Sequence, residues 1–463
     1  MKLSGKTKKI IYGVIAGVVA VLGVLLAAAL AFYVKRADGA FAHSEIIYVI
    51  ATLLILLPVL LAVLFVTLIL KSKKEKPAEV EVVIEGQSVS TNAQSKSAEK
   101  VSEDGIRFDG LTKLDKSKLS FTRAEYDETV TLKGLCEKFR NYSAYKLKLY
   151  YSEADIRRFV AGMAVSHILI LQGMSGTGKT SLAYAFGEFL DNTSTVIPVQ
   201  PMWKERTDLI GYFNEFTKRF NETDLLKKMY EANYSKDIYV TVLDEMNIAR
   251  VEYYFAEFLS LLELPDADKR QLCVVTDEWE HDPEQMKDGH IKLPENMWFI
   301  GTANNDDSTF AISDKVYDRA MIMDLDSKAE PFIAPKTKRL HITHERFEKL
   351  IEEAQQEYCL SERNKRRLEK LDKYLIEKFH ITFGNRIMKQ IESYIPIYVS
   401  CGGTELEALD DILAKKVMRK LGMQNPVYIR NNAEKLVRYM DELFGEENLI
   451  LCKNFVKRLE HNA

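Results

Sequence analysis

Residues 168–180 read Ile-Leu-Ile-Leu-Gln-Gly-Met-Ser-Gly-Thr-Gly-Lys-Thr, and this stretch decides the fold. The apolar residues 168–171 predict a buried strand, and residues 181–190 predict a helix shortly after it. Between them, residues 173–180 match G-x-x-x-x-G-K-[ST], whose glycines let the backbone curl until its N–H groups face a phosphate. The N-terminus of the helix adds the positive end of its dipole. A strand, this loop and a helix in that order predict a nucleoside triphosphate site.

The residues of this loop have separate predicted roles. Lys179 is expected to meet the β- and γ-phosphates, and the hydroxyl of Thr180 is expected to hold Mg²⁺. The nucleotide is expected to contact nine consecutive residues, namely Gly173, Met174, Ser175, Gly176, Thr177, Gly178, Lys179, Thr180 and Ser181.

A second apolar run, residues 238–243, ends in Asp244 and Glu245. A strand there would bring Asp244 to the metal, usually through water, and would place Glu245 to orient or deprotonate the attacking water. Taken alone, the run is equally typical of a strand that ends in two solvated acids. Asp244 follows Lys179 by 65 residues (244 − 179), and the two motifs together predict one active site with Asp244 and Thr180 as its metal ligands.

The pattern around these motifs predicts an α/β fold followed by an all-helical part. Near-continuous apolar strands separated by helices are typical of a parallel sheet that is covered on both faces. We expect an α/β subdomain over residues 166–334, preceded by a helical segment over 105–165, with further strands at residues 195–199, 238–243, 298–300 and 321–323. A helical lid subdomain is expected over 335–463, with helices at residues 343–358, 361–379, 384–397, 404–420 and 431–444.

Over roughly residues 150–450 the chain resembles the AAA+ ATPases, and within them the MoxR/McrB-like group. The residues that carry the resemblance are the acidic motif with its following helix (243–263), a stretch similar to the group's insert (207–211), a candidate hairpin (272–276 with 290–293) and a candidate first sensor (301–305). Membership would imply a P-loop ATPase that works as a homo-hexameric ring.

The resemblance also implies roles for four further residues. Asn304 would polarise the attacking water or contact the γ-phosphate, although it could be an ordinary turn residue, and Asn247 would position water or cap a helix. Arg319 matches the arginine that one subunit offers to its neighbour's γ-phosphate, with a structural ion pair as the alternative and Lys315 as a residue that could share the task. Arg386, in Phe-Gly-Asn-Arg at 383–386, resembles the second sensor on the lid.

The same resemblance bears on the choice of nucleotide and on substrate contact. The GTP-using McrB branch carries Met-Asn-Thr-Ala-Asp where this chain has Thr-Ala-Asn-Asn-Asp-Asp at 302–307, so ATP is the expected nucleotide. Three aromatic residues in or beside the insert-like stretch could touch a substrate or simply pack: Trp203, Tyr212 and Phe213.

The N-terminus contains two long stretches without a charged residue, 10–34 and 46–70. Each has about the 20–25 residues that a helix needs to cross a bilayer. A cleaved signal peptide is the alternative for the first, but such apolar cores run to only about 15 residues. Lysines flank the outer ends of the two spans, which predicts a cell-membrane protein with both termini and the ATPase part in the cytoplasm. Residues 77–104 are predicted to form a flexible linker.

Net charge and the spacing of the cysteines bear on whether the chain binds nucleic acid or a metal. Residues 1–76 hold ten Lys/Arg and three Asp/Glu (+7), so residues 77–463 carry −10 of the total of −3. An acidic body does not favour nucleic acid as a partner. The five cysteines have no metal-ligand spacing and are expected to be reduced.

Three functions follow as hypotheses. The first is a membrane-anchored ATPase that remodels a protein partner, whose identity is unknown, at the cytosolic face. The second is the motor of a McrB-like restriction or defence assembly with a separate nuclease. The third is a nucleotide-gated scaffold that turns over slowly. The membrane spans and the −10 charge favour the first over the second, and Glu245, Asn304 and Arg386 favour turnover over the third.

Overall fold

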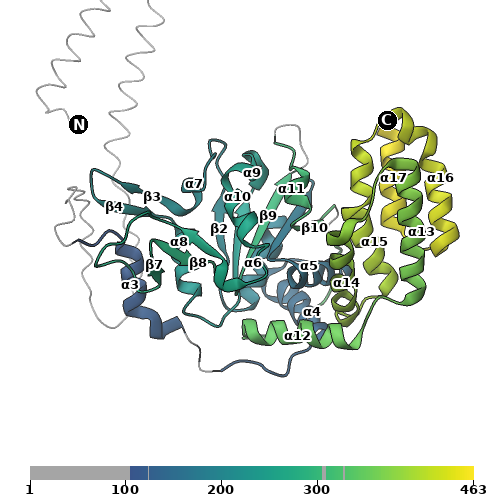
Figure 1. Cartoon of the computed structure of the whole chain (residues 1–463). Helices are drawn as coiled ribbons and strands as arrows, with labels where there is room; N and C mark the ends of the chain where they lie inside the picture. Colours follow the sequence, from purple (N-terminus) through teal and green to yellow (C-terminus); the bar gives the residue numbers. More distant parts are fainter. Residues whose placement is uncertain (1–104, 122, 124, 305–308, 327–328, 463) are drawn as a thin grey trace, which may run out of the picture. The chain divides into compact units, whose positions relative to one another are not determined.

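The computed structural model describes residues 105–462 except 122, 124, 305–308 and 327–328 (Figure 1). The two predicted spans, 10–34 and 46–70, and the predicted linker, 77–104, lie outside the described residues and stay predictions. Among the helices of the described part, none is both long enough and apolar enough to cross a membrane.

A five-stranded parallel sheet forms the centre of the α/β part (Figure 1). Its order is β10-β1-β9-β5-β2, and the bounds are β1 Ile168–Gly173, β2 Thr195–Pro198, β5 Tyr239–Asp244, β9 Met297–Asn304 and β10 Met321–Asp324. All five strands were predicted, because each carries the apolar run that a strand buried inside a parallel sheet requires. Gly173 is level with Asn304, and Leu243 is level with Gly301, so the carboxyl ends of the three central strands meet at one edge.

Alternate residues of β1 enter different hydrophobic cores, as the two-residue period of a strand demands. Leu169 and Leu171 pack into the first core, and Ile168 and Ile170 pack into the second. The first core includes helices α4 Leu132–Tyr142, α5 Glu153–Val165 and α6 Lys179–Phe189. The second includes α3 Asp109–Ser117, α8 Asp224–Ala232, α9 Val251–Tyr254 and α10 Ala256–Leu261. The sheet is therefore covered on both faces.

Two small antiparallel sheets interrupt this pattern. The predicted hairpin is confirmed as β6 Gln271–Cys273 paired with β8 His290–Lys292, and β7 Met286–Lys287 pairs with β8 as well. The insert-like stretch forms α7 Thr207–Ile210 and leads into β3 Gly211–Asn214, which pairs with β4 Arg219–Glu222. Gly211 has φ 101°, and a Cβ there would lie 1.9 Å from the backbone oxygen of Asn221, so only glycine fits this start of the hairpin.

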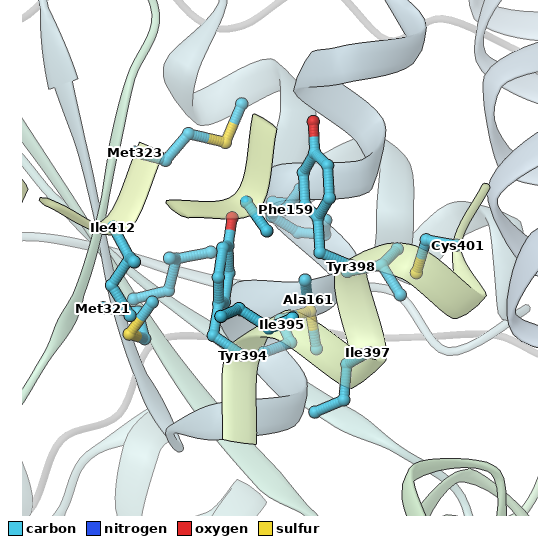
Figure 2. Packing of buried hydrophobic residues seen from close by; sticks show 14 of the residues in the cluster. Phe159, Ala161, Met321, Met323, Tyr394, Ile395, Ile397, Tyr398, Cys401 and Ile412 are labelled. Atoms are coloured by element: carbon cyan, nitrogen blue, oxygen red, sulfur yellow. The ribbon is translucent and has the colours of Figure 1, made fainter. Parts of the chain in front are cut away.

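The C-terminal part is helical, as predicted, with six long helices in place of five. Their bounds are α12 His344–Glu357, α13 Glu362–Phe379, α14 Gly384–Ser400, α15 Glu405–Lys416, α16 Pro426–Phe444 and α17 Ile450–Asn462, of which α17 was not predicted; a short 3₁₀ turn, η5 Met418–Met423, follows α15. Figure 2 shows Tyr394, Ile395 and Tyr398 of α14 in the same buried cluster as Phe159 of α5 and Met321 of β10. The helical part thus shares a continuous core with the α/β part.

Candidate active site

The loop between β1 and α6 has the backbone that its glycines predict. Gly178, directly before α6, has φ 95°, and Gly173 has φ 140°. A Cβ on Gly173 would lie 2.5 Å from the backbone oxygen of Leu325, which follows β10, so a side chain has no room there. A Cβ on Gly176 would meet nothing within 4 Å. The loop is therefore tightly packed at Gly173, next to the end of β10, and open at Gly176.

Lys179 lies inside this curve. Its side chain is buried, and Nζ donates to the backbone oxygens of Gly173 at 3.0 Å and Met174 at 2.7 Å. The hydroxyl of Tyr151 donates to the backbone oxygen of Gly178 at 3.3 Å. Burial raises the pKa of Tyr151, so the hydroxyl keeps its proton and remains a donor at neutral pH. The ammonium is thus held within the loop that is expected to surround the phosphates.

Asp244, at the end of β5, links β9 to the first turn of α6 at the carboxyl edge of the sheet. The hydroxyl of Thr180 donates to Asp244 Oδ1 at 2.6 Å, and the hydroxyl of Thr302 on β9 donates to the same oxygen at 2.8 Å. Thr302 is 2% exposed, so its hydroxyl needs these partners. The two sequence motifs therefore meet in one site.

Glu245 has an unusual backbone conformation, with φ 52° and ψ 45°. Its N–H donates to the hydroxyl of Thr302 at 2.8 Å, and its carbonyl accepts from Ile248 N–H at 2.9 Å. The left-handed region costs a non-glycine residue about 1–2 kcal/mol, and such strain persists where the surroundings hold it. The backbone of Glu245 is thus fixed from both sides while the residue itself is exposed to solvent.

Asn247 supports the backbone of the candidate sensor. Its Nδ2 donates to Asn304 O at 2.9 Å, Thr309 Oγ1 at 2.9 Å and Phe310 O at 3.3 Å, and its Oδ1 accepts from Asn304 N at 3.3 Å. The amide of Asn247 is therefore committed to the protein, and it positions Asn304. Its expected contact with water stays a prediction.

Arg319 and Arg386 meet at a single carboxylate, that of Glu263. Nε of Arg319 lies 2.7 Å from Glu263 Oε2, and an Nη of Arg386 lies 2.7 Å from Glu263 Oε1. The ion pair that was the alternative for Arg319 is therefore present. The structure places the two arginines together on Glu263, and no motif in the sequence predicted that they would share a partner. Their roles toward a nucleotide stay predictions.

Thr302 and Glu263 belong to this region, and the sequence did not single them out as site residues. Thr302 lies inside the quoted sensor stretch, two residues before Asn304, and Glu263 is the last residue of the quoted acidic motif and its helix. Both were within recognised motifs, but their partners are far away in the chain, at residues 244–245 and at residues 319 and 386. The signal available for Thr302 was a hydroxyl two residues after the apolar run 298–300.

The residues present fit Mg²⁺ and a nucleoside triphosphate. Mg²⁺ prefers oxygen ligands and usually takes one or two carboxylates together with waters and substrate phosphates. Asp244 and Thr180 supply one carboxylate and one hydroxyl in direct contact. Within the described residues, no group of three or more His, Cys, Asp or Glu side chains is placed to hold a metal, so a metal here would depend on phosphate oxygens as well.

The three aromatic residues beside the insert have different surroundings. Trp203 packs edge-on against Tyr254 at 5.5 Å, and Phe213 packs edge-on against Trp279 at 5.8 Å. Tyr212 is exposed, and so is Phe216 at 92%, in the turn between β3 and β4. Trp203 and Phe213 are therefore packing residues. Tyr212 and Phe216 are the exposed aromatic residues of the hairpin.

Comparison with known families agrees with this geometry. Residues 168–320 match the model of the AAA domain (dynein-related subfamily), so this part of the chain is similar to an AAA domain. The match begins with β1 and ends directly before β10. No curated protein matches the chain.

Two solved structures are similar to the chain at low identity. One, from Cytophaga hutchinsonii ATCC 33406, is described as a "putative ATPase"; it is 13% identical, covers 71% of this chain and 96% of its own, and has a TM-score of 0.42. The other is a full-length MCM homolog from Methanopyrus kandleri, 12% identical, covering 64% of this chain and 62% of its own, with a TM-score of 0.35. Similarities of this size do not bear on function.

Proposed function

We propose that the chain is a membrane-anchored AAA+ ATPase of the MoxR/McrB-like group, which couples ATP hydrolysis to the remodelling of a protein partner at the cytosolic face of a membrane. The observation that carries the enzymatic part is the network at the sheet edge, where Thr180, Thr302 and Asp244 join the loop, the sensor strand and Glu245.

The residues of this network divide the chemistry among them. Mg²⁺ bound with ATP supplies charge neutralisation at the phosphates, and Thr180 and Asp244 are the residues that would hold it. Lys179 and the N–H groups of the loop bind the phosphates. Glu245, exposed on a fixed backbone, accepts a proton from water, and Asn304, positioned by Asn247, orients that water.

A second subunit completes the site in this proposal. Arg319 is the residue offered to the neighbour's γ-phosphate, where a guanidinium stabilises charge that develops during transfer. Its Nε pairs with Glu263, and its two terminal nitrogens appear in no ion pair of the described residues. A head-to-tail contact of this kind closes into a ring, and a homo-hexamer is the proposed assembly.

The proposed substrate is a protein. Tyr212 and Phe216 expose aromatic surface on the β3–β4 hairpin, and Met202, 77% exposed, lies shortly before α7. Exposed apolar groups on a protruding hairpin suit transient contact with a polypeptide. The −10 charge of residues 77–463 does not favour nucleic acid, and the two predicted spans motivate the membrane location.

The enzymatic part is tested by ATP and GTP hydrolysis of the purified full chain, with the wild type beside Glu245→Gln and assembly followed by light scattering. We expect ATP turnover that Glu245→Gln abolishes while nucleotide still binds. Assembly without turnover of either nucleotide would instead favour a nucleotide-gated scaffold. Turnover that survives in Glu245→Gln would reject the assignment of the base.

A further inference from the structure

Residues 314–320, here called the arginine turn, carry Arg319 between α11 Asp314–Tyr317 and β10. Lys416, at the end of α15, reaches this turn from the helical part. Its Nζ donates to the backbone oxygen of Tyr317 at 2.7 Å and also to the backbone oxygen of Ala320. Lys416 is 2% exposed. The buried amino group of Lys416 therefore ties together the carbonyls on both sides of Arg319.

Other residues of the helical part hold the same turn. Nε2 of Gln390, on α14, donates to Asp318 O at 3.3 Å. The guanidinium of Arg419 donates to Asp314 Oδ1 at 2.5 Å and lies over the ring of Tyr317 at 4.1 Å. The contacts come from α14, α15 and η5, so three segments of the helical part converge on seven residues of the α/β part.

The side chain of Arg319 is linked to the helical part as well. Glu263 follows α10 and pairs with Arg319 through one oxygen and with Arg386, on α14, through the other. From the α/β part, the hydroxyl of Ser166 donates to the backbone oxygen of Arg319 at 3.1 Å. Both the backbone and the guanidinium of Arg319 therefore depend on where the helical part lies.

We propose that Lys416 is a positioning residue for Arg319, so that the helical part of one subunit sets the position of the arginine that acts on the nucleotide of the next subunit. This inference rests on the proposed function, because it requires Arg319 to act in trans. A helical part that moves with its own nucleotide would then change the neighbour's hydrolysis rate through Lys416 and the arginine turn.

The first test is ATP turnover by the full-length variant Lys416→Met, which keeps an unbranched side chain of nearly the same length and removes its donors. Turnover should fall about a hundredfold at unchanged KM, since misplacement of a catalytic group by about 1 Å can cost that much. Arg419→Gln weakens another contact with the arginine turn, from a less buried position. Its ATP turnover should also fall, and this variant replaces Lys416→Met if the latter does not fold. The matched control is Arg438→Gln, which removes an exposed charge on α16 whose one ion pair among the described residues is with Glu434.

Mixing experiments distinguish action on the neighbour from action within the subunit. Lys416→Met has an intact phosphate-binding loop, and Lys179→Ala has an intact arginine turn. When equal amounts of the two variants mix at random in a head-to-tail ring, an intact phosphate-binding loop faces an intact arginine turn at about one interface in four. We expect activity to return to about that fraction of wild type, as it should for Arg319→Ala mixed with Lys179→Ala. A mixture as inactive as its components, in either pair, would overturn the inference.

Hydrogen–deuterium exchange gives a readout that does not need turnover. In Lys416→Met the peptide that contains the arginine turn should exchange faster, whereas the peptide that contains residues 173–181 should be unchanged. Equal protection of the turn in wild type and variant would also overturn the inference. If wild type hydrolyses no ATP, the proposed function fails, and the exchange result still decides whether Lys416 holds the turn.

Discussion

The hydroxyl of Thr302 joins the catalytic base to the metal ligand, and its removal has a predictable cost. Thr302→Val keeps the shape of the side chain but leaves the N–H of Glu245 without its acceptor and Asp244 without one of two hydroxyl donors. A buried polar group left unsatisfied costs about 1–3 kcal/mol. Glu245 also holds a left-handed conformation that this bond helps to maintain. We therefore expect Thr302→Val to lower the free energy of unfolding by about 2 kcal/mol.

The catalytic effect of the same change should exceed its effect on binding. If Glu245 moves by about 1 Å, turnover should fall by about a hundredfold. Among the described residues, the hydrogen bonds of the Thr302 hydroxyl go to Asp244 and Glu245 and not to the phosphate-binding loop, so affinity for ATP should change little.

The assays are urea unfolding followed by tryptophan fluorescence, steady-state ATP hydrolysis, and binding of a fluorescent ATP analogue. Thr302→Ser, which keeps the hydroxyl, is the matched control and should retain most turnover. Wild-type stability and turnover in Thr302→Val would refute the view that Thr302 positions Glu245.

Three further predictions concern the metal, the hairpin and a half-buried histidine. Asp244→Asn should remove the Mg²⁺-dependent gain in ATP affinity and leave affinity in excess chelator unchanged, as measured by titration with a fluorescent analogue; a retained Mg²⁺ effect would exclude Asp244 as a ligand. Gly211→Ala places a Cβ 1.9 Å from Asn221 O in a backbone with φ 101°, so the free energy of unfolding should fall by at least about 1–3 kcal/mol, and an unchanged value would contradict the hairpin geometry. The ring of His167 stacks on Trp298, with 4.8 Å between the ring centroids, and its Nε2 lies 2.9 Å from Glu295 O. Desolvation there lowers the pKa of His167 below its ordinary value of 6.5. The unfolded chain then binds a proton that the folded chain does not, so stability should fall as pH drops below about 6.5, and His167→Gln should show a shallower fall between about pH 6.5 and pH 5.

The sequence predicted those parts of the site that are local in the chain. The loop at residues 173–180 follows from its own glycines, and the five strands follow from apolar runs that a doubly covered sheet requires. Asp244 and Glu245 were predictable because they end such a run. Each of these signals is contained in a few consecutive residues.

The parts that were missed depend on register or on distant partners. Thr302 reaches Asp244 only because β9 pairs with β5 so that Leu243 is level with Gly301. The β3–β4 hairpin has four-residue strands whose exposed Tyr212 and polar neighbours give no apolar run. The joint pairing of Arg319 and Arg386 with Glu263 depends on how the helical part packs against the α/β part, which no local pattern records.

The central claim is that ATP is hydrolysed at a site that a second subunit completes. Its most direct test is the ATPase activity per chain of the purified wild type, measured over a range of protein concentration that spans the assembly transition seen by light scattering. We predict that activity per chain rises with assembly and reaches a plateau, while Arg319→Ala assembles but stays inactive. Constant activity per chain down to concentrations at which the protein is monomeric would contradict the claim, because the site would then be complete within one chain.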